Sequence, residues 1–126
     1  MSDAPELRHT FPARLRLKSP AQFKAVYDLK KSASDARLVV YAGPNGLPHP
    51  RLGLSVSRRV GNAVTRNTVR RRLREVFHEA RPRIDVGLDL VLSARPASAQ
   101  ASYEDLKAEF ARALGRLGSS ATPRGG

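Results

Sequence analysis

The sequence predicts a single α+β domain, a two-layer α/β sandwich in which helices pack on one small mixed sheet. Apolar residues recur at helical spacing in three segments, and they alternate or cluster in three shorter segments typical of strands. The order α-β-β-α-β-α is typical of an α+β sandwich. The 126 residues suit one domain. We place it at residues 14–117, between tails at 1–13 and 118–126 that we expect to be disordered.

The first helix has a clear start. Ser19 is the expected N-cap, Gln22 completes a capping box, and Pro20 suits the first turn. Apolar side chains then recur at helical spacing, and we expect the helix to end near residues 30–31.

Two strands are expected next, and we expect them to pair as neighbours. The first is the β-rich run at residues 37–41, followed by a Gly/Pro/Asn-rich turn or loop over residues 43–50. The second, at residues 51–57, alternates strictly, with Leu52, Leu54 and Val56 on one face.

The second half of the chain predicts a helix, a strand and a final helix. The first of these helices covers residues 63–80 and is stopped by Pro82. The strand covers residues 88–94. The last helix is capped by Ser102 and ends before Gly118.

The charge is large and unevenly distributed. The chain has 23 Lys and Arg against 11 Asp and Glu, a net charge of +12. Residues 51–83 hold 10 basic and 2 acidic side chains, whereas residues 84–126 hold 5 of each. A positive field concentrated in this way attracts polyanions, so it indicates nucleic acid rather than a merely solvated surface.

The helix at residues 63–80 has two distinct faces. Its apolar stripe, expected in the core, is Val69, Leu73, Val76, Phe77 and Ala80. A neighbouring face is polar and mostly basic, with Arg66, Asn67, Arg70, Arg71 and Arg74. Arginines four residues apart repel each other, and their planar groups bind phosphate oxygens in pairs. We therefore expect this face to contact nucleic acid.

Aromatic side chains indicate a second binding surface. Phe23 and Tyr27 share a helix face, Lys24 lies beside them, and Tyr41 lies on the adjacent strand. Aromatic rings near cations stack on unpaired bases. For Phe23 alone, a place in the core is an equally good interpretation.

No enzyme site is visible, and we predict neither a catalytic residue nor a metal site. The chain has no cysteine, and His9, His49 and His78 lack metal-ligand spacing. Asp85 and Asp89, near the start of a strand, are expected to be solvated.

The N-terminal segment has no secretory signal, and no apolar run is long enough to span a bilayer. We expect a cytoplasmic protein.

One stretch resembles a known family. Residues 54–75, LSVSRRVGNAVTRNTVRRRLRE, closely resemble the signature of the bacterial ribonuclease P protein: a strand ending in a basic pair, then Gly-Asn-Ala, then a helix opening with Arg-Asn-Arg. Weaker similarity covers residues 15–114. One position departs from the motif, because Thr68 stands where the family has the second arginine of Arg-Asn-Arg. Arg71 or Arg72 is the candidate to replace the missing positive charge.

The resemblance implies a left-handed βαβ crossover and a division of labour. The RNA subunit, with Mg²⁺, removes the 5′ leader of precursor tRNA, and the protein grips both RNAs without being catalytic alone. We expect a monomer in a one-to-one ribonucleoprotein.

The resemblance also assigns residues. The implied contacts to the catalytic RNA are Arg58, Arg59, Asn62, Arg66, Asn67, Arg70, Arg71 and Arg74. The implied contacts to the leader are Phe23, Lys24, Tyr27 and Tyr41.

Three alternatives remain open at this point. A ribosomal or other structured-RNA-binding protein would present the same basic helix. A helix-turn-helix DNA-binding protein needs a short turn between two helices, where this sequence predicts a strand at residues 88–94. A self-sufficient nuclease needs a catalytic group of carboxylates and histidines, and this sequence shows no such group.

Overall fold

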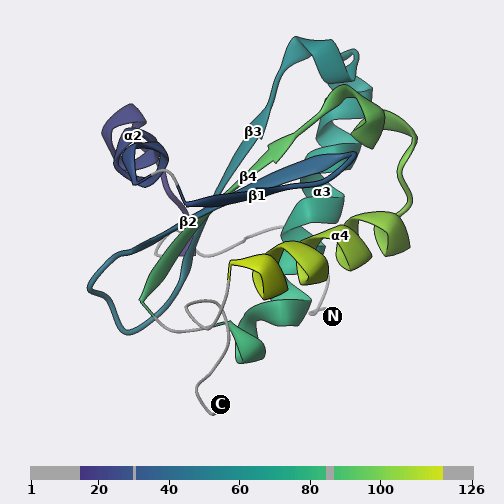
Figure 1. The fold of residues 1–126 in the computed structure, drawn as a ribbon. Helices are drawn as coiled ribbons and strands as arrows, with labels where there is room; N and C mark the ends of the chain where they lie inside the picture. Colours follow the sequence, from purple (N-terminus) through teal and green to yellow (C-terminus); the bar gives the residue numbers. More distant parts are fainter. Residues whose placement is uncertain (1–14, 30, 85–86, 118–126) are drawn as a thin grey trace, which may run out of the picture.

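The computed structural model describes residues 15–29, 31–84 and 87–117, so the expected tails lie outside the described residues. Within these segments the chain forms three α-helices and a four-stranded sheet (Figure 1). The helices are α2 (Pro20–Asp28), α3 (Ala63–Ala80) and α4 (Tyr103–Arg116). The strands are β1 (Ser32–Ser34), β2 (Leu38–Pro44), β3 (Arg51–Val56) and β4 (Leu88–Ala94).

The three predicted helices are confirmed, because their end signals are local. Ser19 and Gln22 form the capping box of α2, and Ser102 forms another with Asp105 at the start of α4. Helix α3 covers the predicted range and buries the predicted apolar stripe. Helix α2 is shorter than expected, since it ends at Asp28.

The predicted pairing of β2 with β3 is wrong. The sheet order is β1-β2-β4-β3, with β4 antiparallel to β2 and parallel to β3. Six of the seven β4 residues are buried, so this strand belongs in the middle of the sheet with both faces covered.

Two further strand details differ from the prediction. Strand β2 continues through Pro44 into the segment expected to turn. Strand β1 was not predicted, because Ser-Ala-Ser carries little β propensity.

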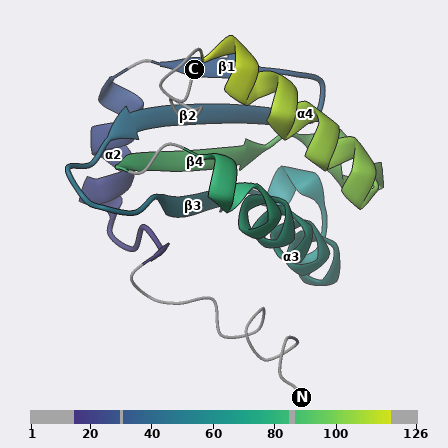
Figure 2. The same ribbon diagram turned by 90° about the horizontal axis from the view of Figure 1, so that it is seen from below.

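The helices lie on both faces of the sheet. Helices α3 and α4 cover one face of the sheet (Figure 2). They enclose the main core, which includes Leu73, Phe77 and Phe110 from the helices and Val40 and Leu92 from the sheet. Helix α2 lies on the opposite face, over a smaller cluster of Leu17, Val26 and Val91. The sandwich therefore has a third, partial layer that the sequence did not predict.

Helix α3 connects the parallel strands β3 and β4. The left-handed sense of this crossover stays a prediction. None of the helices in the described segments combines the length and the apolar character needed to cross a membrane.

Asp89 is not solvated as expected, because it is the acceptor of a buried ion pair. Arg51 donates to it through Nε at 2.9 Å and Nη2 at 2.8 Å, and Asn45 donates through Nδ2 at 2.8 Å. Arg51 and Asp89 are directly opposite each other in neighbouring strands, so the sheet register brings them together.

Candidate RNA-binding site

The predicted basic residues lie on α3 and the short turn before it, and together they are called the arginine surface. This surface consists of Arg58, Arg59, Asn62, Arg66, Asn67, Arg70, Arg71 and Arg74. Arg58 and Arg59 lie in a short 3₁₀ helix, Arg58–Val60, and both are exposed. Asn62 is the N-cap of α3, and its side chain accepts a hydrogen bond from the Thr65 amide at 2.9 Å.

Two hydrogen bonds position the middle of the arginine surface. Arg66 donates through Nε to the Gly61 carbonyl at 3.0 Å. Arg70 donates through Nη1 to Asn67 Oδ1 at 2.9 Å. In the described part of the chain, none of the six arginines of this surface has a carboxylate within ion-pairing distance. No carboxylate of the described segments therefore neutralises their charge.

Arg72 does not belong to this surface. Its Nη1 donates to the Ala101 carbonyl at 2.8 Å, so it ties α3 to the segment before α4. It is not available to replace the charge missing at Thr68, whose hydroxyl donates to the Val64 carbonyl within the helix. Arg71, which is exposed, remains the candidate.

The predicted aromatic residues come together as an aromatic cleft, which consists of Phe23, Tyr27 and Tyr41. The Phe23 and Tyr27 ring centroids are 6.5 Å apart, and the Tyr27 and Tyr41 centroids are 4.8 Å apart with the rings edge to face. All three are half-buried against the small cluster under α2. Each ring is therefore partly packed in this cluster and partly exposed.

Lys24 lies beside the cleft but already has a partner. Its Nζ is 2.7 Å from Asp28 Oδ2 on the outer surface of α2. Both side chains are well exposed, so this ion pair is weak.

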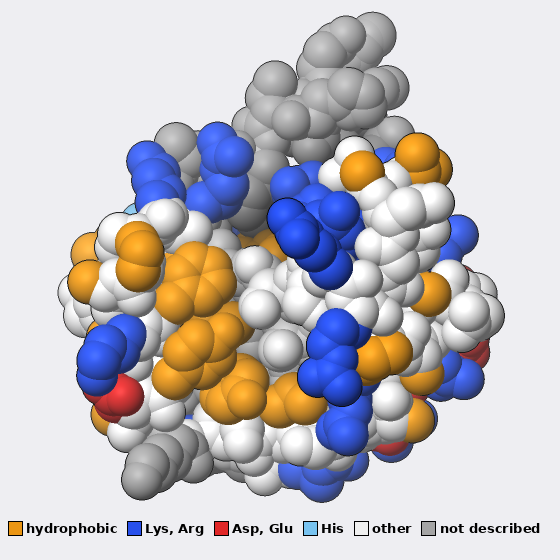
Figure 3. All heavy atoms as spheres, turned by 90° about the horizontal axis from the view of Figure 1, so that it is seen from above, with side chains coloured by type: hydrophobic (Ala, Val, Ile, Leu, Met, Phe, Trp, Pro, Cys, Tyr) orange, Lys and Arg blue, Asp and Glu red, His pale blue; other side chains and the backbone are white. Residues whose placement is uncertain are grey.

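The floor next to the aromatic cleft is made of small side chains. The sheet register places Val39, Ser93 and Ser55 side by side in the row after Tyr41, Val91 and Gly53. Figure 3 shows a shallow hollow on one face of the molecule, with hydrophobic side chains along one side and Lys and Arg side chains along the other. An extended single strand of nucleic acid lying in this hollow can therefore contact aromatic rings on one side and cationic side chains on the other.

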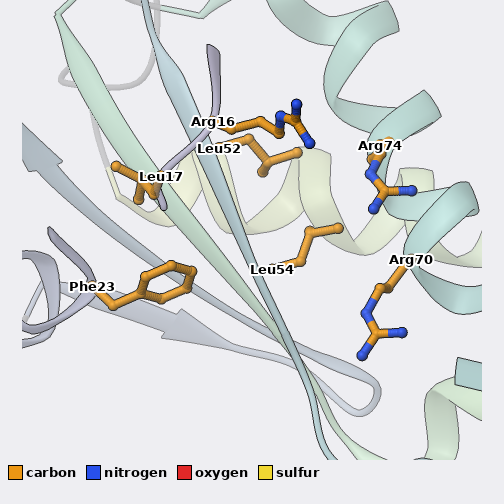
Figure 4. A pocket seen from close by; sticks show the side chains of 7 residues that line it. All are labelled: Arg16, Leu17, Phe23, Leu52, Leu54, Arg70 and Arg74. Carbon is orange, nitrogen blue, oxygen red and sulfur yellow. The ribbon is translucent and has the colours of Figure 1, made fainter. Parts of the chain in front are cut away.

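A pocket of about 170 Å³ joins the two surfaces. It lies between α3 and the outer edge of β3, and its lining consists of Arg16, Leu17, Phe23, Leu52, Leu54, Arg70 and Arg74 (Figure 4). Burial lowers the pKa of the Arg74 guanidinium, and the positive charges of Arg16 and Arg70 lower it further.

Arg16 is a site residue that the sequence analysis missed. A signal was present, because Leu15 and Leu17 are buried and the residue between them must point outward.

The described residues contain no group of three or more His, Asp or Glu side chains that could hold a metal ion. The functional groups that the candidate site presents are guanidinium groups and aromatic rings. Such a surface neutralises phosphates and stacks on bases.

Comparison with known proteins gives consistent results. A family model described as Ribonuclease P matches residues 11–118. The ribonuclease P protein component of Streptococcus thermophilus is 40% identical over 99 residues, covering 79% of this chain and 88% of that protein. The protein component of Acidothermus cellulolyticus is 39% identical over 116 residues, covering 90% and 97%.

Solved structures agree. The Staphylococcus aureus RNase P protein superposes with a TM-score of 0.75 at 30% identity, covering 82% of this chain and 95% of that one. The Thermotoga maritima RNase P protein, in complex with 1-(4-fluorophenyl)-2-thiourea, gives a TM-score of 0.71 at 28% identity, covering 77% and 94%.

Proposed function

Because the chain belongs to the ribonuclease P protein family, the protein components of a tRNA-processing endoribonuclease, we propose which of its surfaces serve which RNA. The arginine surface binds the catalytic RNA. The aromatic cleft binds the unpaired 5′ leader of precursor tRNA. The observation that carries this proposal is the pocket that joins the two surfaces, with Phe23 opposite Arg70 and Arg74, so that a leader in the cleft lies beside an RNA bound to the arginine surface.

Electrostatics support the contact with the catalytic RNA. None of the six arginines has a carboxylate partner among the described residues, so RNA need not displace any described carboxylate from them. Each phosphate that they neutralise releases counterions, which favours binding at low salt.

Ring geometry supports the contact with the leader. The three rings are held by packing against Leu17, Val26 and Val91, so little side-chain freedom is lost when a base stacks. A base paired within the tRNA body is already stacked and hydrogen-bonded, whereas a leader base is free to enter.

The protein residues are proposed to bind and orient, and the RNA subunit to supply the chemistry. Guanidinium groups and aromatic rings are not ligands for Mg²⁺, which prefers oxygen. We therefore assign the required Mg²⁺ to the RNA subunit. We also propose one protein monomer per RNA.

Reconstitution tests the proposal. The protein is combined with a bacterial ribonuclease P RNA and precursor tRNA at low Mg²⁺, and the 5′ end of the product is mapped. We expect cleavage at the mature 5′ end with both subunits and no cleavage by the protein alone. Robust cleavage by RNA-free protein contradicts the division of labour. A protein that binds the RNA but raises no cleavage is a structured-RNA-binding protein without this role.

A further inference from the structure

Arg16 is held in a fixed place at the outer edge of the sheet. Strand β3 is an edge strand, and the segment before α2 runs parallel to it at one point, where Arg16 is the bridge partner of Leu52. The Leu17 amide donates to the Leu52 carbonyl at 2.9 Å. Leu15 and Leu17 are buried on either side. The backbone of Arg16 is therefore anchored while its side chain remains exposed.

Three guanidinium groups meet at the pocket. Arg16 approaches from the segment before α2, whereas Arg70 and Arg74 approach from successive turns of α3 (Figure 4). Among the described residues, none of the three forms an ion pair with a carboxylate. Arg74 is partly buried between the other two charges, which makes its own charge costly there. An anion in the pocket removes this repulsion.

We propose that Arg16, Arg70 and Arg74 form a binding site for one phosphodiester group of the leader, whose neighbouring base stacks on Phe23. This inference rests on the proposed function and changes one part of it. Arg70 and Arg74 move from the set implied to hold the catalytic RNA to the set that holds the substrate. Arg16, which no motif marks, becomes a substrate-binding residue.

The leader is a better source of this phosphate than the catalytic RNA. Phe23 lines the same pocket as the three arginines, so the strand that offers the phosphate also offers a base to the ring. Arg58, Arg59 and Arg66 belong to the turn before α3 and its first turn, and they do not line the pocket. They are left to hold the catalytic RNA.

The first experiment uses the Arg16→Ala variant and measures three affinities: holoenzyme for precursor tRNA, holoenzyme for mature tRNA, and protein for the catalytic RNA. We expect the affinity of the holoenzyme for precursor tRNA to fall about tenfold, the low end for a hydrogen bond to a charged group in an open site. Affinity of the holoenzyme for mature tRNA and of the protein for the catalytic RNA should not change. Arg16→Lys, which keeps the charge but loses the planar fork, should fall in between.

Lys18→Ala is the matched control. Lys18 lies two residues from Arg16, and its side chain is exposed and does not line the pocket. The change therefore removes one positive charge close to the pocket without altering its lining. It should weaken precursor binding by less than about twofold, as expected for a screened surface charge. Thermal unfolding of each variant shows whether the fold is intact.

The second experiment locates the phosphate. Single neutral methylphosphonate linkages are placed along the leader, one position at a time. With the wild-type protein, one position should lose about tenfold in affinity. With the Arg16→Ala protein, the same substitution should cost almost nothing, since the contact is already gone.

The outcomes separate this inference from the proposed function. If every methylphosphonate costs the same with both proteins, or if Arg16→Ala weakens binding to the catalytic RNA instead, the leader-phosphate site is wrong. If the wild-type enzyme binds precursor and mature tRNA equally, the proposed leader function itself fails, whatever Arg16 does.

Discussion

The Phe23 ring lies directly over the α-carbon of Gly53. A methyl group placed on Gly53 would lie 2.7 Å from Cζ of the ring, closer than van der Waals contact allows. The absence of a side chain at Gly53 of β3 is therefore what leaves room for the Phe23 ring at the edge of the sheet, next to the pocket.

Gly53→Ala should displace the Phe23 ring and weaken leader binding. We expect the affinity of the holoenzyme for precursor tRNA to fall roughly threefold to tenfold, part of the ~1–3 kcal/mol that a stacked base contributes. Gly115→Ala, in α4 with nothing within 4 Å of the added methyl group, is the control. It should leave RNA binding unchanged and stabilise the helix by about 0.8–1.0 kcal/mol. Equal precursor affinity for wild-type and Gly53→Ala proteins would show that the ring position is unimportant.

Tyr27→Ala should remove the central ring of the aromatic cleft. The affinity for a precursor with a leader of several nucleotides should fall about tenfold, while affinity for mature tRNA should barely change. Tyr27→Phe should lose little if stacking dominates. Equal losses for precursor and mature tRNA, with unchanged thermal stability, would remove this face from the leader site.

Arg71→Ala should change the salt dependence of binding to the catalytic RNA. Arg71 is exposed on α3, so its contribution is that of a phosphate contact. The slope of log K against log[salt] should become shallower by about 0.7–0.9. Arg112→Ala is the control, because Arg112 is an exposed arginine of α4 that is paired with Asp35. A slope that is unchanged in both variants contradicts a role for this face of α3.

Arg51→Ala should destabilise the fold. It leaves the carboxylate of Asp89, whose side chain is only 8% exposed, with Asn45 as its remaining side-chain donor. Breaking a buried pair in this way costs about 3 kcal/mol or more, measurable by urea unfolding. Arg112→Ala, which breaks the more exposed pair with Asp35, should cost about 1 kcal/mol or less. Similar losses for both variants would show that burial of Asp89 is unimportant.

Tyr103 should make stability fall in strong base. Burial raises the pKa of Tyr103 to about 12, and its hydrogen bond to the Glu79 carboxylate acts in the same direction. The unfolded value is about 10, so the folded state disfavours the phenolate. The stabilisation is complete below pH ~10 and is lost as the pH rises towards about 12. In an ultraviolet titration, one phenolate signal should appear last, and Tyr103→Phe should remove it. A titration in which Tyr103→Phe leaves the last signal in place would contradict this assignment.

Local features of the fold were predictable from the sequence. The bounds of α3 and its buried stripe follow from Asn62, Pro82 and a clear helical period, all of which act within a few residues. The neighbours of β2 were not predictable in the same way, because strand pairing depends on residues far apart. The sequence signal for a central strand was the nearly continuous apolar run at residues 88–94, which is typical of a strand buried on both faces.

The candidate site also has a part that local sequence patterns predict and a part that depends on distant segments of the chain. The arginines of α3 lie on one helix, and so do Phe23 and Tyr27, so helical periodicity predicted these groups. Arg58, Arg59 and Asn62 were implied by the family resemblance. The pocket combines Arg16, Phe23 and Arg74, which come from three segments of the chain. No single periodic pattern contains all three, and Arg16 was missed for that reason.

The position of β4 in the sheet has a consequence for biosynthesis. Strands β2 and β3 do not touch as partners; each pairs with β4, which is the last strand to be made. A nascent chain that ends before Leu88 therefore has no continuous sheet on which α3 can pack. The sheet can close only after Ala94 has left the ribosome, because both of its main ladders need that strand. Helix α3 is therefore synthesised before the strand that completes the sheet on which it packs.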